Sequence, residues 1–166
     1  MYIADKYLEN YIGDTDDSLT LVEYLAEKQK EEIPVGEIFS DFGLEKLNGN
    51  FQNPDIPLIF EDSEGYEQDI HYAIVLITDL AALLLECKVN GSVNLCELFG
   101  GDLEEAVAPD VRITAAPEEN ELINKAIMDF ISTPLAYDLS EMMPEEDMME
   151  MASICEQLRK ELYGNR

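Results

Sequence analysis

The sequence predicts a mainly α-helical protein of the α+β class. We expect a helical bundle around a central apolar helix at about residues 69–89, with a small sheet of two or three strands. Hydrophobic residues make up 46% of the 166-residue chain, more than a disordered acidic protein carries. Residues 73–85 form a long apolar run, and amphipathic helical patterns lie on both sides of it. Because this length suffices to bury one core, residues 1–166 are expected to form a single domain.

The first long helix is predicted in the N-terminal part of the chain. Leu19, Val22 and Leu25 recur on one side of a helix, and charged residues occupy the other side. This helix should begin after residue 17 and end before Pro34. In residues 34–53, apolar residues recur at loose helical spacing between glycines, so short helical turns are expected there.

A short strand is predicted at residues 58–60, where Leu-Ile-Phe leads into an acidic turn at 61–65. Two further segments, 93–95 and 111–114, alternate between apolar and polar residues as short strands do. We expect these two segments to pair with 58–60 in the small sheet.

The central helix is predicted from Asp69 to Lys88. This run is too long for a strand and carries apolar residues almost all round, which is typical of a buried helix. It should end at Asn90 and Gly91, because both residues tolerate the left-handed conformation that stops a helix.

Two helices are predicted near the C-terminal end. Pro117 and Pro144 are each followed by several acidic residues, and carboxylates in a first turn face the positive end of the helix dipole. Pro134 should end the first of these helices and Gly164 the second. Apolar residues at helical spacing follow both starts and predict one buried stripe on each helix.

Cysteine usage and the apolar runs bear on the compartment. The three cysteines are an odd number without a CxxC pair, which favours a reducing environment. Charged residues interrupt the N-terminus before a signal-peptide core develops. The longest apolar stretch, 72–85, is shorter than the roughly 20 residues that a membrane helix needs. We therefore expect a soluble, cytoplasmic protein.

Few residues suggest catalysis or metal binding. Residues 14–18 resemble the start of a calcium-binding loop, but Leu19 replaces the glycine that such a loop needs. We interpret this segment as a loop that caps the following helix. No glycine-rich loop suits a phosphate, and His71 is the only histidine, so a zinc site built on a histidine pair is excluded. No metal, cofactor or catalytic residue is predicted.

Two titratable residues in the central helix could still be functional. His71 should lie in its first turn, hydrogen-bonded and partly buried. Asp79 has apolar neighbours on both sides, so it is either a buried functional carboxylate or part of a solvent-facing stripe. We favour the stripe, which would include Tyr72, Ala82 and Glu86.

Net charge is the strongest indication of what the chain binds. Asp and Glu number 37 against ten Lys and Arg, which gives a formal charge of −27. Such a field attracts cations and basic surfaces and repels nucleic acid and anionic membranes. We therefore expect a basic protein partner, and neither nucleic acid nor a membrane.

The acidic residues are concentrated in the middle of the chain. Residues 31–110 contain 18 acidic residues and only two lysines, a net charge of −16. They form two clusters that we place in loops, where recognition residues are common. Together with Tyr66 as a possible anchor, the predicted partner-binding residues are Glu61, Asp62, Glu64, Tyr66, Glu67, Asp69, Asp102, Glu104, Glu105 and Asp110.

Several classes of function fit these observations. Our preferred hypothesis is a non-catalytic acidic protein that neutralises a basic partner, as an immunity-type inhibitor of a toxin or nuclease does, because opposite charge gives fast association. One alternative is a DNA-mimic or anti-restriction inhibitor, although its carboxylates should be regularly spaced and these clusters are irregular. The others are an adaptor that docks through the Met-rich segment 142–151 and a carboxylate-based enzyme.

Overall fold

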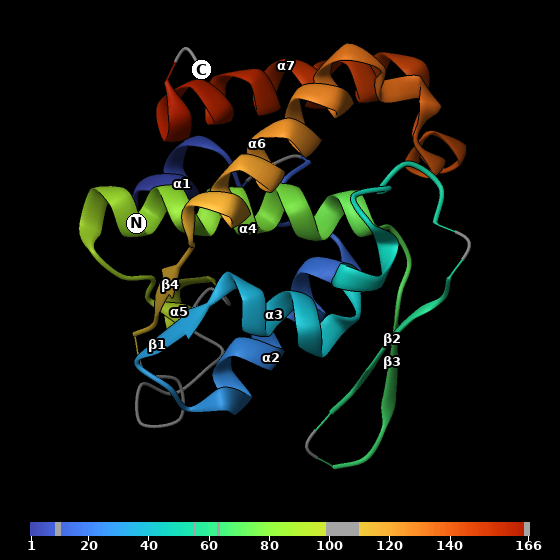
Figure 1. Ribbon diagram of the computed structural model, residues 1–166. Coiled ribbons are helices and arrows are strands. Elements are labelled where there is room, and N and C mark those ends of the chain that lie inside the picture. The colour runs from blue at the N-terminus through green and yellow to red at the C-terminus, as the bar shows by residue number, and fades with distance from the viewer. Residues whose placement is uncertain (9–10, 55, 63, 99–109, 165–166) are drawn as a thin grey trace.

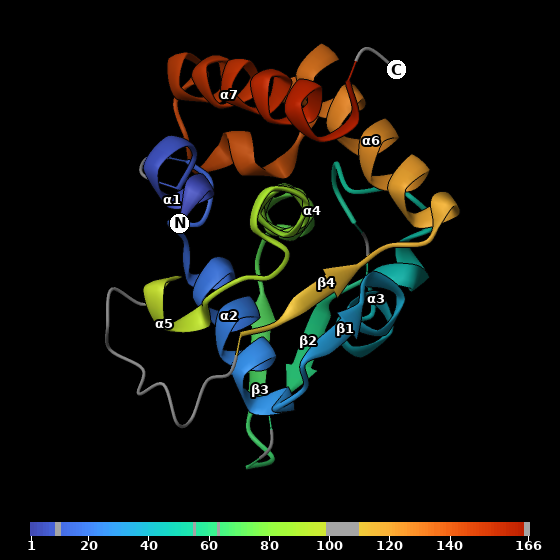
Figure 2. The same ribbon diagram turned by 90° about the vertical axis from the view of Figure 1, so that its left-hand side faces the viewer.

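The computed structural model describes residues 1–8, 11–54, 56–62, 64–98 and 110–164. In this part of the chain, helices surround one central helix and the strands form two small two-stranded sheets. The prediction of a mainly helical α+β fold with a small sheet is confirmed. Figure 2 looks along the central helix, α4 (Ala73–Asn90), and shows the other helices around it.

Helix α4 is buried along most of its length. Every residue from Ala73 to Glu86 is buried, because α1 (Tyr2–Lys6), α2 (Asp16–Lys28) and two C-terminal helices pack around it. The helix ends as predicted, with Gly91 at φ 88° donating its N–H to the Cys87 carbonyl oxygen over 2.9 Å. Its predicted start at Asp69 is wrong, since residues 67–70 form a strand.

Helix α2 begins with the predicted cap. The Thr15 hydroxyl oxygen accepts a hydrogen bond from the Ser18 N–H over 3.1 Å, which satisfies an N–H that has no partner inside the helix. The predicted short turns follow as α3 (Val35–Phe42) and η1 (Leu44–Leu47).

The strands pair differently from the prediction. Strand β2 (Leu58–Glu61) pairs antiparallel with β3 (Glu67–Ile70), and β1 (Glu32–Pro34) pairs parallel with β4 (Arg112–Thr114). Segments 93–95 and 111–114 do not join β2; they meet only in a bridge between Val93 and Val111, and Leu95 starts α5 (Leu95–Leu98). The β2–β3 pairing is favoured because a short turn closes it at a small entropic cost.

The C-terminal part follows the prediction. Helices α6 (Pro117–Ser132) and α7 (Glu145–Tyr163) begin after Ala116 and Pro144, and η2 (Pro134–Ala136) and η3 (Asp138–Glu141) connect them. Figure 1 shows α6 and α7 crossing above α4. Most residues of their predicted stripes are buried: Ile123, Ala126, Ile127, Phe130, Met148, Met151, Ala152, Cys155 and Leu158. The others are partly buried: Leu122, Ile131 and Leu162. None of the helices in the described part of the chain combines the length and hydropathy that crossing a membrane requires.

Candidate functional site

Strands β2 and β3 form a hairpin that extends away from the helices (Figure 1). It brings together the first predicted acidic cluster. Glu61 ends β2, and Asp62, Glu64 and Tyr66 belong to the turn. Glu61 therefore lies in a strand, as do Glu67 and Asp69 in β3, so the predicted loop placement of these three residues is wrong.

The register of the hairpin separates an inner from an outer face. Leu58 and Ile70 pair with each other and are buried. On the other face, Ile59 lies opposite Asp69 and Glu61 lies opposite Glu67, and all four are exposed. Because side chains alternate along a strand, these four residues share one face. We call them the outer face of the hairpin.

The outer face carries uncompensated negative charge. Glu61 and Glu67 are directly paired, and like charges opposite each other destabilise a strand pair. None of the ion pairs between described residues involves a hairpin carboxylate. Lys28 lines a cavity together with Glu61, but its ammonium group pairs with Asp41 over 2.8 Å. A cationic surface from another molecule would therefore relieve the repulsion.

Asp62 has a structural role in the turn. Its carboxylate accepts hydrogen bonds from the backbone N–H groups of Glu64 and Tyr66 over 3.0 and 2.9 Å, and from the Gln68 amide over 3.4 Å. Gly65 adopts φ 88°, a conformation that favours glycine. Asp62 thus shapes the turn, whereas Glu64 and the 65% exposed Tyr66 project from it.

The second predicted cluster is described only in part. Asp102, Glu104 and Glu105 lie outside the described residues. Asp110 is exposed and lies two residues before β4. Strand β4 belongs to the sheet that does not contain the hairpin.

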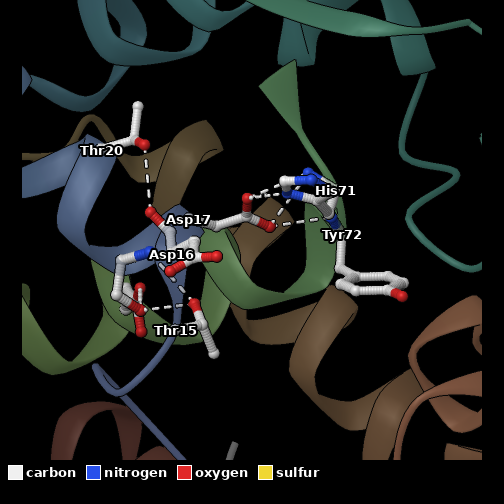
Figure 3. A network of polar contacts seen from close by, with 8 residues as sticks. Thr15, Asp16, Asp17, Thr20, His71 and Tyr72 are labelled. Carbon is white, nitrogen blue, oxygen red and sulfur yellow. Dashed lines mark hydrogen bonds and ion pairs between the residues drawn. The ribbon is translucent and has the colours of Figure 1, made fainter. Parts of the chain in front are cut away.

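Asp17 connects the start of α2 to the base of the hairpin (Figure 3). Its buried carboxylate accepts hydrogen bonds from the His71 N–H over 3.0 Å and from the Tyr72 N–H over 2.8 Å. The His71 ring nitrogen Nδ1 lies 3.1 Å from the same carboxylate. Asp17 thereby satisfies the N–H groups of the two residues that lead into α4 at Ala73.

Sequence reasoning missed Asp17 and misplaced His71. His71 precedes α4 instead of lying in its first turn, and its side chain is 59% exposed rather than partly buried. Because the helix was predicted to begin at Asp69, the sequence pattern did not indicate that the His71 and Tyr72 N–H groups need an acceptor from elsewhere.

Asp79 is buried, so the predicted solvent-facing stripe is wrong. Its exposed fraction is 5%, and Ala82 and Glu86 are buried as well. Helix α1 covers this side of α4, where the Ile3 N–H donates to Glu86 over 3.0 Å. Asp79 accepts hydrogen bonds from the Gly13 N–H over 2.9 Å and from the Ser18 hydroxyl over 2.5 Å. Burial, which disfavours the charged form, raises the pKa of Asp79 to about 7.

Asp79 also borders a cavity of about 270 Å³, lined by apolar side chains such as Leu21 and Leu83. Within the described residues, no group of three or more His, Cys, Asp or Glu is placed so that it could hold a metal ion. The hydrogen bonds of Asp79 join α4 to the segment before α2 and to the first turn of α2. This carboxyl therefore has a role in the fold.

Comparison with protein families matched residues 2–162 to the model of a family described as Immunity protein 68. Comparisons with curated proteins and with solved structures found no match. The family match covers nearly the whole chain and includes α4, the hairpin and the Asp17 network. The chain therefore belongs to the Immunity protein 68 family.

Proposed function

We propose that this immunity protein neutralises a toxin by covering a basic surface of it, such as the substrate-binding face of a nuclease domain. Neutralisation is stoichiometric, without catalysis or a cofactor, and residues 1–166 act as one domain in the cytoplasm. Membership of an immunity protein family supports a toxin as the partner. The basic character of the bound surface rests on one observation, the uncompensated outer face of the hairpin.

Electrostatic attraction gives this surface its kinetic advantage. The net charge of −27 steers a basic partner toward the protein, and such steering raises association rates at low salt. The hairpin extends from the body of the molecule (Figure 1), and Glu61, Glu64 and Glu67 on it are exposed, so a concave basic surface can reach these carboxylates. Glu61 and Glu67 gain most, since a bound cation screens their mutual repulsion.

Apolar side chains between the carboxylates add affinity. Ile59 lies on the outer face opposite Asp69, and Tyr66 is exposed at the turn. Interface energy is concentrated in a few such residues, with Tyr prominent among them. The carboxylates of the hairpin thus speed association with the toxin, and the side chains of Tyr66 and Ile59 slow its dissociation.

The adaptor alternative has less support. Met148 and Met151, which belong to the Met-rich segment, are buried in the core, whereas Met142 and Met149 are exposed. An apolar docking surface formed by the whole segment would need Met148 and Met151 to be accessible as well, so only its exposed methionines can contact a partner.

Binding kinetics with a toxin domain encoded in a neighbouring reading frame test the proposal. The triple variant Glu61→Gln, Glu64→Gln and Glu67→Gln removes three hairpin charges but keeps Asp62 and the turn. We expect association to slow about ten-fold at low salt, and the loss to shrink as salt screens the charges.

The matched control removes three exposed carboxylates far from the hairpin in sequence, with Glu118→Gln, Glu121→Gln and Glu156→Gln on α6 and α7. It changes the net charge equally, so only a general charge effect would slow both variants alike. Equal slowing, or tight binding that salt does not weaken, would contradict a hairpin-directed basic partner.

A further inference from the structure

A groove of about 500 Å³ lies beside the base of the hairpin. One side is formed by the segment leading into α2 and the other by residues between η3 and α7. Its lining includes Asp14, Asp16, Tyr72, Leu139, Met142 and Met143. Chain segments that are distant in sequence therefore meet in one concavity.

The apolar part of the groove is accessible. Met142 is 70% exposed, Met143 and Tyr72 are half-buried, and Leu139 is buried beneath them. A flexible thioether adapts its shape to a bound group, and the face of a tyrosine ring attracts cations. This wall suits a side chain that is both flat and positively charged.

The rest of the lining combines four aspartates with three other polar or aromatic residues: Asp14, Asp16, Asp17, Asp147, Tyr11, Thr15 and His71. Asp14 and Asp16 are exposed, and Asp147 accepts a hydrogen bond from the Tyr11 hydroxyl over 3.1 Å. No Lys or Arg is among the described residues that line the groove. Burial raises the pKa of the nearby Asp138, and the Glu141 and Asp17 carboxylates add to that shift. The groove is therefore a region of negative potential.

Asp17 does not take part in ligand binding, because its carboxylate is occupied by His71 and Tyr72. Asp14 and Asp16 are the exposed carboxylates at this wall. Figure 3 shows Asp16 next to Asp17, and it shows the Asp17 carboxylate facing His71 and Tyr72. Since β3 ends at Ile70, the groove begins where the hairpin meets the body of the protein.

We infer that this groove binds an arginine side chain of the toxin, with the guanidinium against Tyr72 and Met142 and its N–H groups donating to Asp14 and Asp16. The inference rests on the proposed function and adds an anchoring contact to the steering by the hairpin. Arginine fits better than lysine because its guanidinium is planar, weakly hydrated and able to donate to two carboxylates at once. Desolvated anchors of this kind dominate interface energies.

Dissociation kinetics of the complex with the same toxin domain test the groove. Met142→Ala and Asp16→Asn alter exposed side chains, so the fold should persist. Each is expected to weaken affinity about ten-fold, a larger loss than most interface residues give when truncated, mainly through faster dissociation. Met149→Ala is the matched control, because Met149 is 53% exposed in the same Met-rich segment but does not line the groove. Glu121→Gln is the control for the lost charge.

A second measurement isolates the guanidinium. In protein with ¹³C-labelled methionine methyl groups, N-acetyl-arginine amide should shift the resonances of Met142 and Met143 but not those of Met128 and Met149. N-acetyl-citrulline amide, which has the same shape without the charge, should shift none of them. Equal shifts with both compounds, or shifts spread over all exposed methionines, would overturn the arginine assignment.

The outcomes separate the two proposals. If the hairpin variant slows association while Met142→Ala and Asp16→Asn bind like the parent protein, the groove inference is wrong and the proposed function stands. If the parent protein fails to bind the toxin domain, the proposed function is wrong, and the groove inference that rests on it fails as well.

Discussion

The substitution Asp79→Asn should stabilise the protein at neutral and alkaline pH. The carboxylate lies in the core, where the Gly13 N–H donates to one oxygen and the Ser18 hydroxyl lies 2.5 Å from the other. An amide fits the same arrangement. Its oxygen accepts from Gly13, its NH₂ group donates to the Ser18 oxygen, and the Ser18 hydroxyl can donate to Thr15 at 3.0 Å.

The size of the effect follows from the pKa of Asp79. Folding raises this pKa from 3.8 to about 7, so the unfolded chain loses the proton at lower pH than the folded protein. The stability contributed by the protonated carboxyl is complete below pH 3.8 and is lost as pH rises to about 7. At about 1.4 kcal/mol per pKa unit, the total loss is about 4 kcal/mol as an upper bound. Asp79→Asn avoids this loss because the amide does not ionise.

Urea denaturation of both proteins between pH 4 and pH 8.5 measures the difference. We expect the free energy of unfolding of Asp79→Asn relative to the parent protein to rise with pH and to level off above pH 7. Asp69→Asn, which removes one exposed carboxylate from the hairpin, is the control and should differ from the parent by about 0.5 kcal/mol or less at every pH. A pH-independent difference for Asp79→Asn, or a destabilised variant at pH 8, would refute the reasoning.

Two further predictions concern the links between elements. Asp17→Ala removes the acceptor of the His71 and Tyr72 N–H groups and should lower the free energy of unfolding by about 2–3 kcal/mol, measured by urea denaturation. Hydrogen exchange at these two amides should accelerate in the same variant, and unchanged protection would mean that Asp17 does not hold the junction. Phe130→Ala removes a fully buried ring that meets Tyr137 edge-on at 5.0 Å, and should cost about 3–5 kcal/mol. A loss below about 1 kcal/mol in thermal or urea unfolding would show that the contact between α6 and Tyr137, which lies between η2 and η3, is not part of the core.

The sequence predicted the long helices well because each carries its own local pattern. Apolar residues around the whole circumference identified α4, and a proline followed by carboxylates marked the starts of α6 and α7. Strand pairing was predicted poorly. Strands of three residues are too short to show a clear pattern. Strand β1 and its partner β4 are also separated by about half of the chain. The hairpin was half predicted, since 58–60 was recognised as a strand while 67–70 was assigned to a loop and the start of α4.

Composition and local pattern by themselves determined the helical architecture, the charge of −27 and the concentration of acidic residues around 61–69. These properties depend on residues close together in the chain. Tertiary structure alone decided that Glu61 faces Glu67 across a hairpin, that Asp79 is covered by the segment before α2, and that Asp16 meets Met142 in one groove. The burial and the electrostatic environment of a residue depend on which distant segments pack against it. The sequence pattern of a single strand or helix does not specify these segments.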